Sequence, residues 1–156
     1  MSLSAIFFSL FLLLFLCIWI VFSALLAKFS GWQKLAKNNP LKQKNNYSEI
    51  IDFSSIQFNS IGSYNYGILI TLYEDGMGLE PKMLFKAFHK PIYIPWKKIS
   101  KIEATKEFFW FPALDIFVDG NKIRFYGKTA EAITSNYTFF TAQQKTITST
   151  SSESGV

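Results

Sequence analysis

The sequence contains one cysteine and one histidine among its 156 residues, and its only arginine is Arg124. The cysteine, Cys17, lies inside a long apolar run, so no disulfide framework is expected. One histidine and one such cysteine cannot build a tetrahedral nitrogen and sulfur metal site in a single chain. We therefore expect neither a bound metal nor another cofactor.

Sequence motifs for catalysis are also missing. The chain has no G-x-S-x-G elbow, no Walker A motif and no G-x-G-x-x-G fingerprint. Glu103 and Glu107 have no evident partner, and we interpret them as solvated charges. His89 falls in an expected loop, where a surface or capping role is favoured over pH sensing or catalysis. The chain is therefore expected not to be an enzyme.

A long apolar run is what the sequence does contain, from Ala5 to Ala27 without a charged residue. As a helix it would reach about 34 Å at ~1.5 Å per residue, slightly more than the hydrocarbon core of a bilayer. A cleaved signal peptide would have a basic start and a shorter run, and in a lipoprotein the run would end at the cysteine. A buried core helix would show a polar stripe, but only Ser9 and Ser23 interrupt this run. Residues 1–28 are therefore expected to be a tail and a retained transmembrane anchor.

Positive charge follows this run and predicts its orientation. Residues 1–4 carry no Lys or Arg, whereas several lysines follow the run without an intervening acid. By the positive-inside tendency, the C-terminal domain faces the cytoplasm. The net charge of +5 is largely explained by these lysines, and no aromatic and basic motif indicates nucleic-acid binding. The lipid bilayer is the first expected partner, with Lys28, Trp32, Lys34 and Lys37 at its interface.

Residues 29–46 are expected to form an amphipathic juxtamembrane segment followed by a linker. Phe29, Trp32 and Leu35 recur at helical spacing, and Trp32 would lie at the depth of the lipid headgroups. The residues from Asn38 to Pro40 should end this short helix.

The hydrophobic period changes to two in residues 47–145, which indicates β-strands. We predict about seven short antiparallel strands, with a sheet edge, a bulge or a break between two strands at Pro95. Two hairpins are predicted, one about Glu74-Asp75-Gly76 and one about Asp119-Gly120-Asn121. We also predict an irregularity at Ser54-Ser55, a turn or loop from Gly62 to Gly67, and a short strand that begins with Met83, Leu84 and Phe85.

A helix is predicted to close the domain. Thr129 is its expected N-cap, and Ala130, Ile133, Tyr137 and Phe140 recur at helical spacing. Residues 146–156 are polar and are expected to form a disordered tail.

This order of parts resembles the pleckstrin-homology-like superfamily, which includes the GRAM and bacterial pleckstrin-homology-like domains. The motif is carried by Ile94, Pro95, Trp96, Ile99 and Ile102, and His89-Lys90-Pro91 precedes it. Gly31-Trp32, Leu35-Ala36 and Pro40 are similar to the segment that follows the span in uncharacterised bacterial single-span membrane proteins with such a domain. The resemblance covers most of residues 30–140, although Lys90 and Asn39 depart from the commoner Pro and Tyr.

This resemblance implies a mainly β fold, in which a C-terminal helix caps a partly open barrel of seven strands. It also implies a location in the inner, cytoplasmic membrane of a bacterium. It supplies no catalytic residue to carry over.

Two surfaces are candidates for recognition. A basic face could bind anionic lipid headgroups, although lysines on a strand edge also discourage edge pairing. Its expected residues are Lys86, Lys90, Lys97, Lys98, Lys101 and Arg124, with Lys82 upstream. The aromatic run Phe108, Phe109, Trp110 and Phe111 cannot face one core, because alternate residues of a strand point to opposite sides. It is either a membrane wedge or protein-contact patch, or its outward rings are covered by another segment.

From these observations we expect a membrane-tethered, non-catalytic binding module. Its favoured partner is a protein or a second copy of the chain, at the inner membrane surface. A sensor of anionic lipid headgroups is the alternative.

Overall fold

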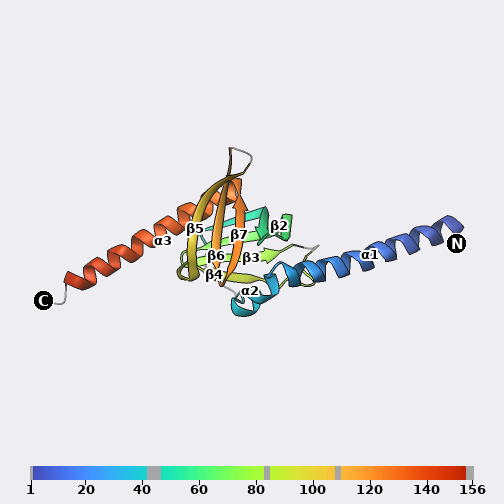
Figure 1. Ribbon diagram of the computed structural model, residues 1–156, viewed down its shortest axis with the longest axis horizontal. Coiled ribbons are helices and arrows are strands. Elements are labelled where there is room, and N and C mark those ends of the chain that lie inside the picture. The colour runs from blue at the N-terminus through green and yellow to red at the C-terminus, as the bar shows by residue number, and fades with distance from the viewer. Residues whose placement is uncertain (1, 42–46, 83–84, 108–109, 154–156) are drawn as a thin grey trace.

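The computed structural model describes residues 2–41, 47–82, 85–107 and 110–153. This part of the chain forms two N-terminal helices, a seven-stranded antiparallel sheet and a long C-terminal helix (Figure 1). The helices are α1 (Leu3–Phe29), α2 (Trp32–Asn38) and α3 (Gly127–Glu153), with a short 3-10 helix η1 (Trp96–Lys98). The strands are β1 (Glu49–Phe58), β2 (Gly62–Tyr73), β3 (Gly76–Pro81), β4 (Ile92–Pro95), β5 (Ile99–Glu107), β6 (Phe111–Val118) and β7 (Asn121–Tyr126).

Helix α1 carries the apolar run, and its large side chains from Leu3 to Phe22 are mostly exposed. Among the described residues it is the one helix long and apolar enough to cross a membrane. Its 27 residues rise about 40 Å at ~1.5 Å per residue, which exceeds the hydrocarbon thickness of a bilayer. Helix α1 is therefore a candidate membrane span.

Helix α2 is part of the core of the β-domain. Trp32, Leu35 and Ala36 are buried against the sheet, and Lys34 and Lys37 point outward. The helix ends at Asn38, as predicted. The prediction of a juxtamembrane segment separate from the domain is therefore wrong for this helix, and residues 42–46 of the expected linker lie outside the described residues.

The strands form one curled sheet in the order β4-β3-β2-β1-β7-β6-β5 (Figure 1). Strand β1 joins the two halves, because it pairs with β2 along its length and with β7 at its end. Its register shifts on both sides of Ser54, which confirms the predicted irregularity. The predicted turn or loop from Gly62 to Gly67 is wrong, because these residues lie within β2, where Gly62, Ser63 and Tyr64 pair with β1.

Both predicted hairpins are confirmed, with different turns. Asp119 and Gly120 have φ of 49° and 74°, the left-handed pair that an Asp-Gly turn favours between β6 and β7. In the β2–β3 turn, neither Glu74 nor Asp75 has a positive φ. Pro95 ends β4 at the sheet edge, and so marks the predicted break. Of the short strand predicted from Met83, residues 83 and 84 lie outside the described residues, and Phe85 lies in a turn.

Helix α3 packs on β6 and β7, where Ala130 and Ile133 enter the core. It begins at Gly127, so Thr129 is not its N-cap, and the Thr129 hydroxyl instead lies 3.3 Å from that of Ser54. The predicted tail is wrong up to Glu153, because the helix continues to that residue; residues 154–156 lie outside the described residues. The predicted fold class is confirmed: a partly open barrel of seven antiparallel strands with a C-terminal helix and an N-terminal apolar helix.

Candidate functional site

The junction between α1 and α2 is tied to the β-domain. Ser30 is fully buried, and its carbonyl oxygen accepts a hydrogen bond from the Asn59 side-chain nitrogen at 2.6 Å. The indole nitrogen of Trp32 donates to the Lys90 carbonyl oxygen at 2.8 Å. Trp32 had been expected at the depth of the lipid headgroups, but it is buried because its ring packs against Phe58 and Tyr64. These contacts fix the direction in which α1 leaves the domain.

His89 lies inside an aromatic cluster and is only 1% exposed, so the expected surface role is wrong, whereas its hydrogen bond to the Phe85 carbonyl is consistent with the capping role. Its Nδ1 lies 2.8 Å from the Phe85 carbonyl oxygen, which can only accept a hydrogen bond. Nδ1 must therefore carry the proton, and neutral Nε2 accepts from the Tyr64 hydroxyl at 2.9 Å. The Tyr64 oxygen lies 3.0 Å from Ser30 Oγ, so the chain of hydrogen bonds ends at the α1–α2 junction.

Burial also sets the protonation of this cluster. It lowers the pKa of His89 below its ordinary value, against the opposing effect of the hydrogen bond to the Phe85 carbonyl. Burial raises the pKa of the Tyr64 hydroxyl to about 12, although the hydrogen bond with Ser30 acts in the other direction. Both groups are therefore neutral near pH 7. Tyr64 and Ser30 carried no sequence signal, because neither belongs to a motif.

Arg124, a candidate headgroup ligand, is paired inside the sheet. Its Nε and Nη2 donate to the two carboxylate oxygens of Asp115 at 2.6 and 2.8 Å, and Lys122 Nζ lies 2.8 Å from the same carboxylate. Burial raises the pKa of Asp115, but the hydrogen bonds from Arg124 and Lys122 outweigh this effect and hold that pKa below its usual value. The charge of Arg124 is therefore directed at Asp115, which faces it from β6.

The candidate lysines near β5 also differ in their surroundings. Lys97 is exposed on η1. Lys98 donates to Asn39 Oδ1 at 2.7 Å, and Asn39 Nδ2 donates in turn to Asp119 at 2.6 Å. Lys101 pairs with Glu103 at 2.6 Å. Lys98 therefore joins η1 to the end of α2, whereas the Lys101–Glu103 pair lies within β5.

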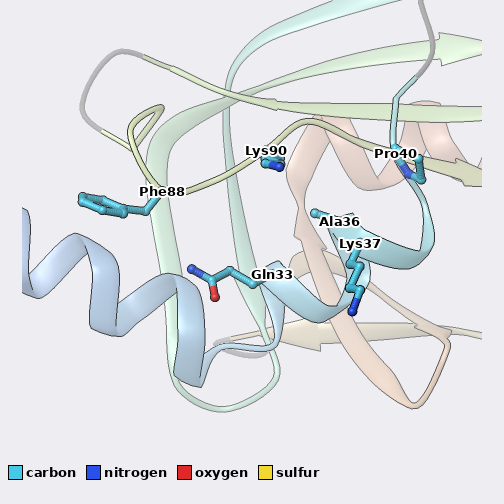
Figure 2. A pocket seen from close by; sticks show the side chains of 6 residues that line it. All are labelled: Gln33, Ala36, Lys37, Pro40, Phe88 and Lys90. Atoms are coloured by element: carbon cyan, nitrogen blue, oxygen red, sulfur yellow. The ribbon is translucent and has the colours of Figure 1, made fainter.

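A cavity of about 510 Å³ brings together lysines from two elements. It lies between α2 and the segment that connects β3 to β4 (Figure 2). Lys37 from α2 and Lys90 from the connecting segment line it, and both are exposed; Lys86 is exposed nearby in the sequence. The other lining residues are Gln33, Ala36, Pro40 and Phe88.

A second, more apolar hollow lies between β5, the start of β6 and α3. It has a volume of about 480 Å³. Trp110, which is 77% exposed, lines it, and the neighbouring Phe111 is 55% exposed. Of the predicted aromatic patch, these two rings are therefore uncovered, and Phe108 and Phe109 lie outside the described residues. We call this hollow the β5–α3 groove; its remaining lining residues are Ala104, Thr105, Lys106, Pro112, Ala113, Leu114, Ala130, Glu131, Thr134 and Ser135.

Strand β5 forms one edge of the sheet and pairs, within the described part of the chain, with β6 alone. An edge strand presents backbone N–H and C=O groups that an added strand can pair with. The groove thus combines an apolar floor, an exposed indole ring and an available strand edge.

Among the described residues, no group of three or more His, Cys, Asp or Glu side chains could hold a metal ion. Within the described part of the chain, the hydrogen-bond partners of His89 are the Tyr64 hydroxyl and the Phe85 carbonyl, and neither is a carboxylate.

No protein-family model matches the sequence, and no curated protein matches it significantly. Solved structures do resemble the fold. One is described as "Vps36 N-terminal PH domain", with 9% identity, a TM-score of 0.46, and coverage of 69% of this chain and 86% of that chain. Another is from "The 8S snRNP Assembly Intermediate", with 10% identity, a TM-score of 0.47, and coverage of 67% and 88%.

Proposed function

We propose that the chain is a single-pass membrane protein whose β-domain binds an extended apolar segment of a partner protein. The β5–α3 groove carries this proposal, because it is apolar and lies beside an edge strand. In this proposal helix α1 is the anchor. The lysines that follow it support a cytoplasmic orientation of the domain, and the resemblance found in the sequence supports the inner membrane of a bacterium as its location.

The arrangement of the two long helices favours a protein over a lipid at this groove. Helix α1 and the C-terminal end of α3 lie at opposite ends of the longest axis of the molecule (Figure 1). With α1 in the bilayer, α3 extends away from it. The groove that Trp110 lines is formed by β5, β6 and α3 of the β-domain, so we propose a protein contact at Trp110 rather than a membrane wedge.

The chemistry of the groove specifies an extended, largely uncharged segment. One lysine and one glutamate line it, Lys106 and Glu131, so it selects neither charge. Backbone pairing with β5 would supply affinity, and alternate side chains of the added strand would enter the groove. The membrane anchor raises the local concentration of both proteins, so weak contacts become effective.

The test is selection of a displayed random decapeptide library on the full chain in nanodiscs. We expect enrichment of peptides with alternating apolar residues that bind neither Trp110→Ala nor Thr134→Trp, a variant that fills the groove. The matched control is Thr138→Trp, because Thr138 is exposed one turn further along α3 and does not line the groove. This control should bind normally.

Failure to enrich any such peptide would overturn the proposal, as would equal binding by the Thr134→Trp variant. The proposal would also be overturned if the full chain forms dimers that dissociate in the Thr134→Trp variant. That result would assign the groove to a second copy of the chain.

A further inference from the structure

The segment between β3 and β4 lies beside the apolar helix. The ring centroid of Phe85 is 6.0 Å from that of Trp19 in α1, and Trp19 is in turn 6.1 Å from Phe22. On its other side, Phe85 contacts Tyr64 and His89 of the domain, with centroid distances of 5.3 and 5.9 Å. One ring therefore joins the β-domain to the apolar run.

The position of Trp19 sets the depth of this contact. From Trp19 to Lys28, the first charge after the run, the helix rises about 14 Å at ~1.5 Å per residue. The headgroup layer on each side of a bilayer is only about 5–8 Å thick. With Lys28 among the headgroups, a side chain in contact with Trp19 lies at the hydrocarbon boundary or below it.

The residues that follow Phe85 suit a membrane surface. Lys86 and Ala87 are exposed, and Phe88 is half-buried at the rim of the cavity that Lys37 and Lys90 line (Figure 2). Phenylalanine beside lysine is the composition of segments that enter the boundary between headgroups and acyl chains. No acid is among the residues that line this cavity.

We propose that residues 85–90 form a second membrane contact, with Phe88 in the interface and Lys37 and Lys90 binding the phosphate groups of anionic lipids. This inference rests on the proposed span of α1. It differs from the basic face predicted from the sequence, because Arg124 is paired with Asp115 and Lys37 takes part. The contact would hold the domain in one orientation on the bilayer.

The experiment places a depth probe on the full chain. Ala87→Cys in a Cys17→Ala background is labelled with an environment-sensitive fluorophore and reconstituted into vesicles of phosphatidylcholine with phosphatidylglycerol. We expect blue-shifted emission and quenching by lipids that carry a shallow spin label. Gln143→Cys, exposed on α3, is the matched control and should report water.

A second arm tests the lysines. The probe at residue 87 reports how strongly the segment contacts the membrane in anionic vesicles compared with neutral ones. Substituting both lysines, Lys37→Gln with Lys90→Gln, should lower this ratio roughly fivefold per lysine. Lys128→Gln with Lys145→Gln, a pair of exposed lysines on α3, removes the same charge and should leave this ratio unchanged.

Three results would overturn the inference. These are an emission at residue 87 that matches residue 143, an equal effect of both lysine pairs, or no effect of either pair. Alkaline carbonate extraction of the same vesicles separates this failure from failure of the span. A chain that stays in the pellet while residue 87 reports water contradicts the second contact alone, whereas a chain that is extracted contradicts α1 as an anchor.

Discussion

The Tyr64 hydroxyl lies 2.9 Å from His89 Nε2, and through this hydrogen bond His89 is connected to Ser30 at the end of α1. Neither residue is charged near pH 7, because burial raises the pKa of one and lowers that of the other. The pair therefore stabilises the junction without a buried charge.

Tyr64→Phe should destabilise the full chain by about 1–3 kcal/mol, because it leaves His89 Nε2 and Ser30 Oγ without this partner. The measurement is urea unfolding in detergent micelles, followed by tryptophan fluorescence. Tyr66→Phe is the matched control, because Tyr66 is 72% exposed, and its effect should stay below about 0.5 kcal/mol. Equal effects of the two substitutions would contradict the role of this hydrogen bond.

Stability should fall as the pH is lowered from about 6.5, the ordinary value for His. The pKa of His89 is lower in the folded chain than in the unfolded chain, so below about pH 6.5 the unfolded chain binds a proton that the folded chain does not. The stability that His89 contributes above this pH is therefore lost progressively until the pH reaches the folded pKa. Tyr64 stays protonated throughout, and the pKa values of Asp52 and Asp115 are lowered from values already below this range. The measurement is urea unfolding at a series of pH values. His89→Gln should remove this dependence of the unfolding free energy on pH. An unchanged dependence in the variant would show that other groups cause it.

Arg124→Gln should destabilise the domain by about 1–3 kcal/mol and leave its contact with anionic vesicles unchanged. The reason is that Arg124 is directed at buried Asp115, which would keep only Lys122 as a cationic partner. Unfolding and the depth probe at residue 87 measure the two effects, with Lys128→Gln as a control. Weakened vesicle contact with unchanged stability would instead make Arg124 the headgroup ligand that its sequence position suggested.

Gly62→Ala should destabilise the chain, because an added Cβ would meet the Cβ of Ser30 where β2 touches the α1–α2 junction. The cost should exceed about 1 kcal/mol, as for other overpacked cores. Gly78→Ala is the comparison, since its Cβ would meet the flexible side chain of Leu41 at 3.3 Å. Thermal unfolding of both variants in micelles measures the difference. A larger loss of stability for Gly78→Ala would contradict the expected steric conflict between residue 62 and Ser30.

The strands and the apolar helix were predictable because their signals are local. An uncharged run and an Asp-Gly turn each specify one structure with little help from the rest of the chain. The positions of Trp32 and His89 were not predictable, because an apolar helix face after a span looks the same whether it packs on lipid or on a sheet. The strand at Gly62–Gly67 was missed for a related reason. The composition of these residues indicates a turn or loop, while the pairing of Gly62, Ser63 and Tyr64 depends on β1.

The candidate site was predictable in part. The sequence indicated an aromatic patch that includes Trp110, but the groove needs α3 beside β5, which no local pattern reveals. Likewise, six basic residues were expected on one face, and the pairing of Arg124 with Asp115 depends on the register between β6 and β7.

The most direct test of the account is the intact mass of the chain recovered from membranes after alkaline carbonate washing. We predict that the chain stays in the pellet with a mass that includes residues 1–28. A soluble chain that begins after Lys28 would contradict the anchor, and with it the orientation of the domain and the second membrane contact.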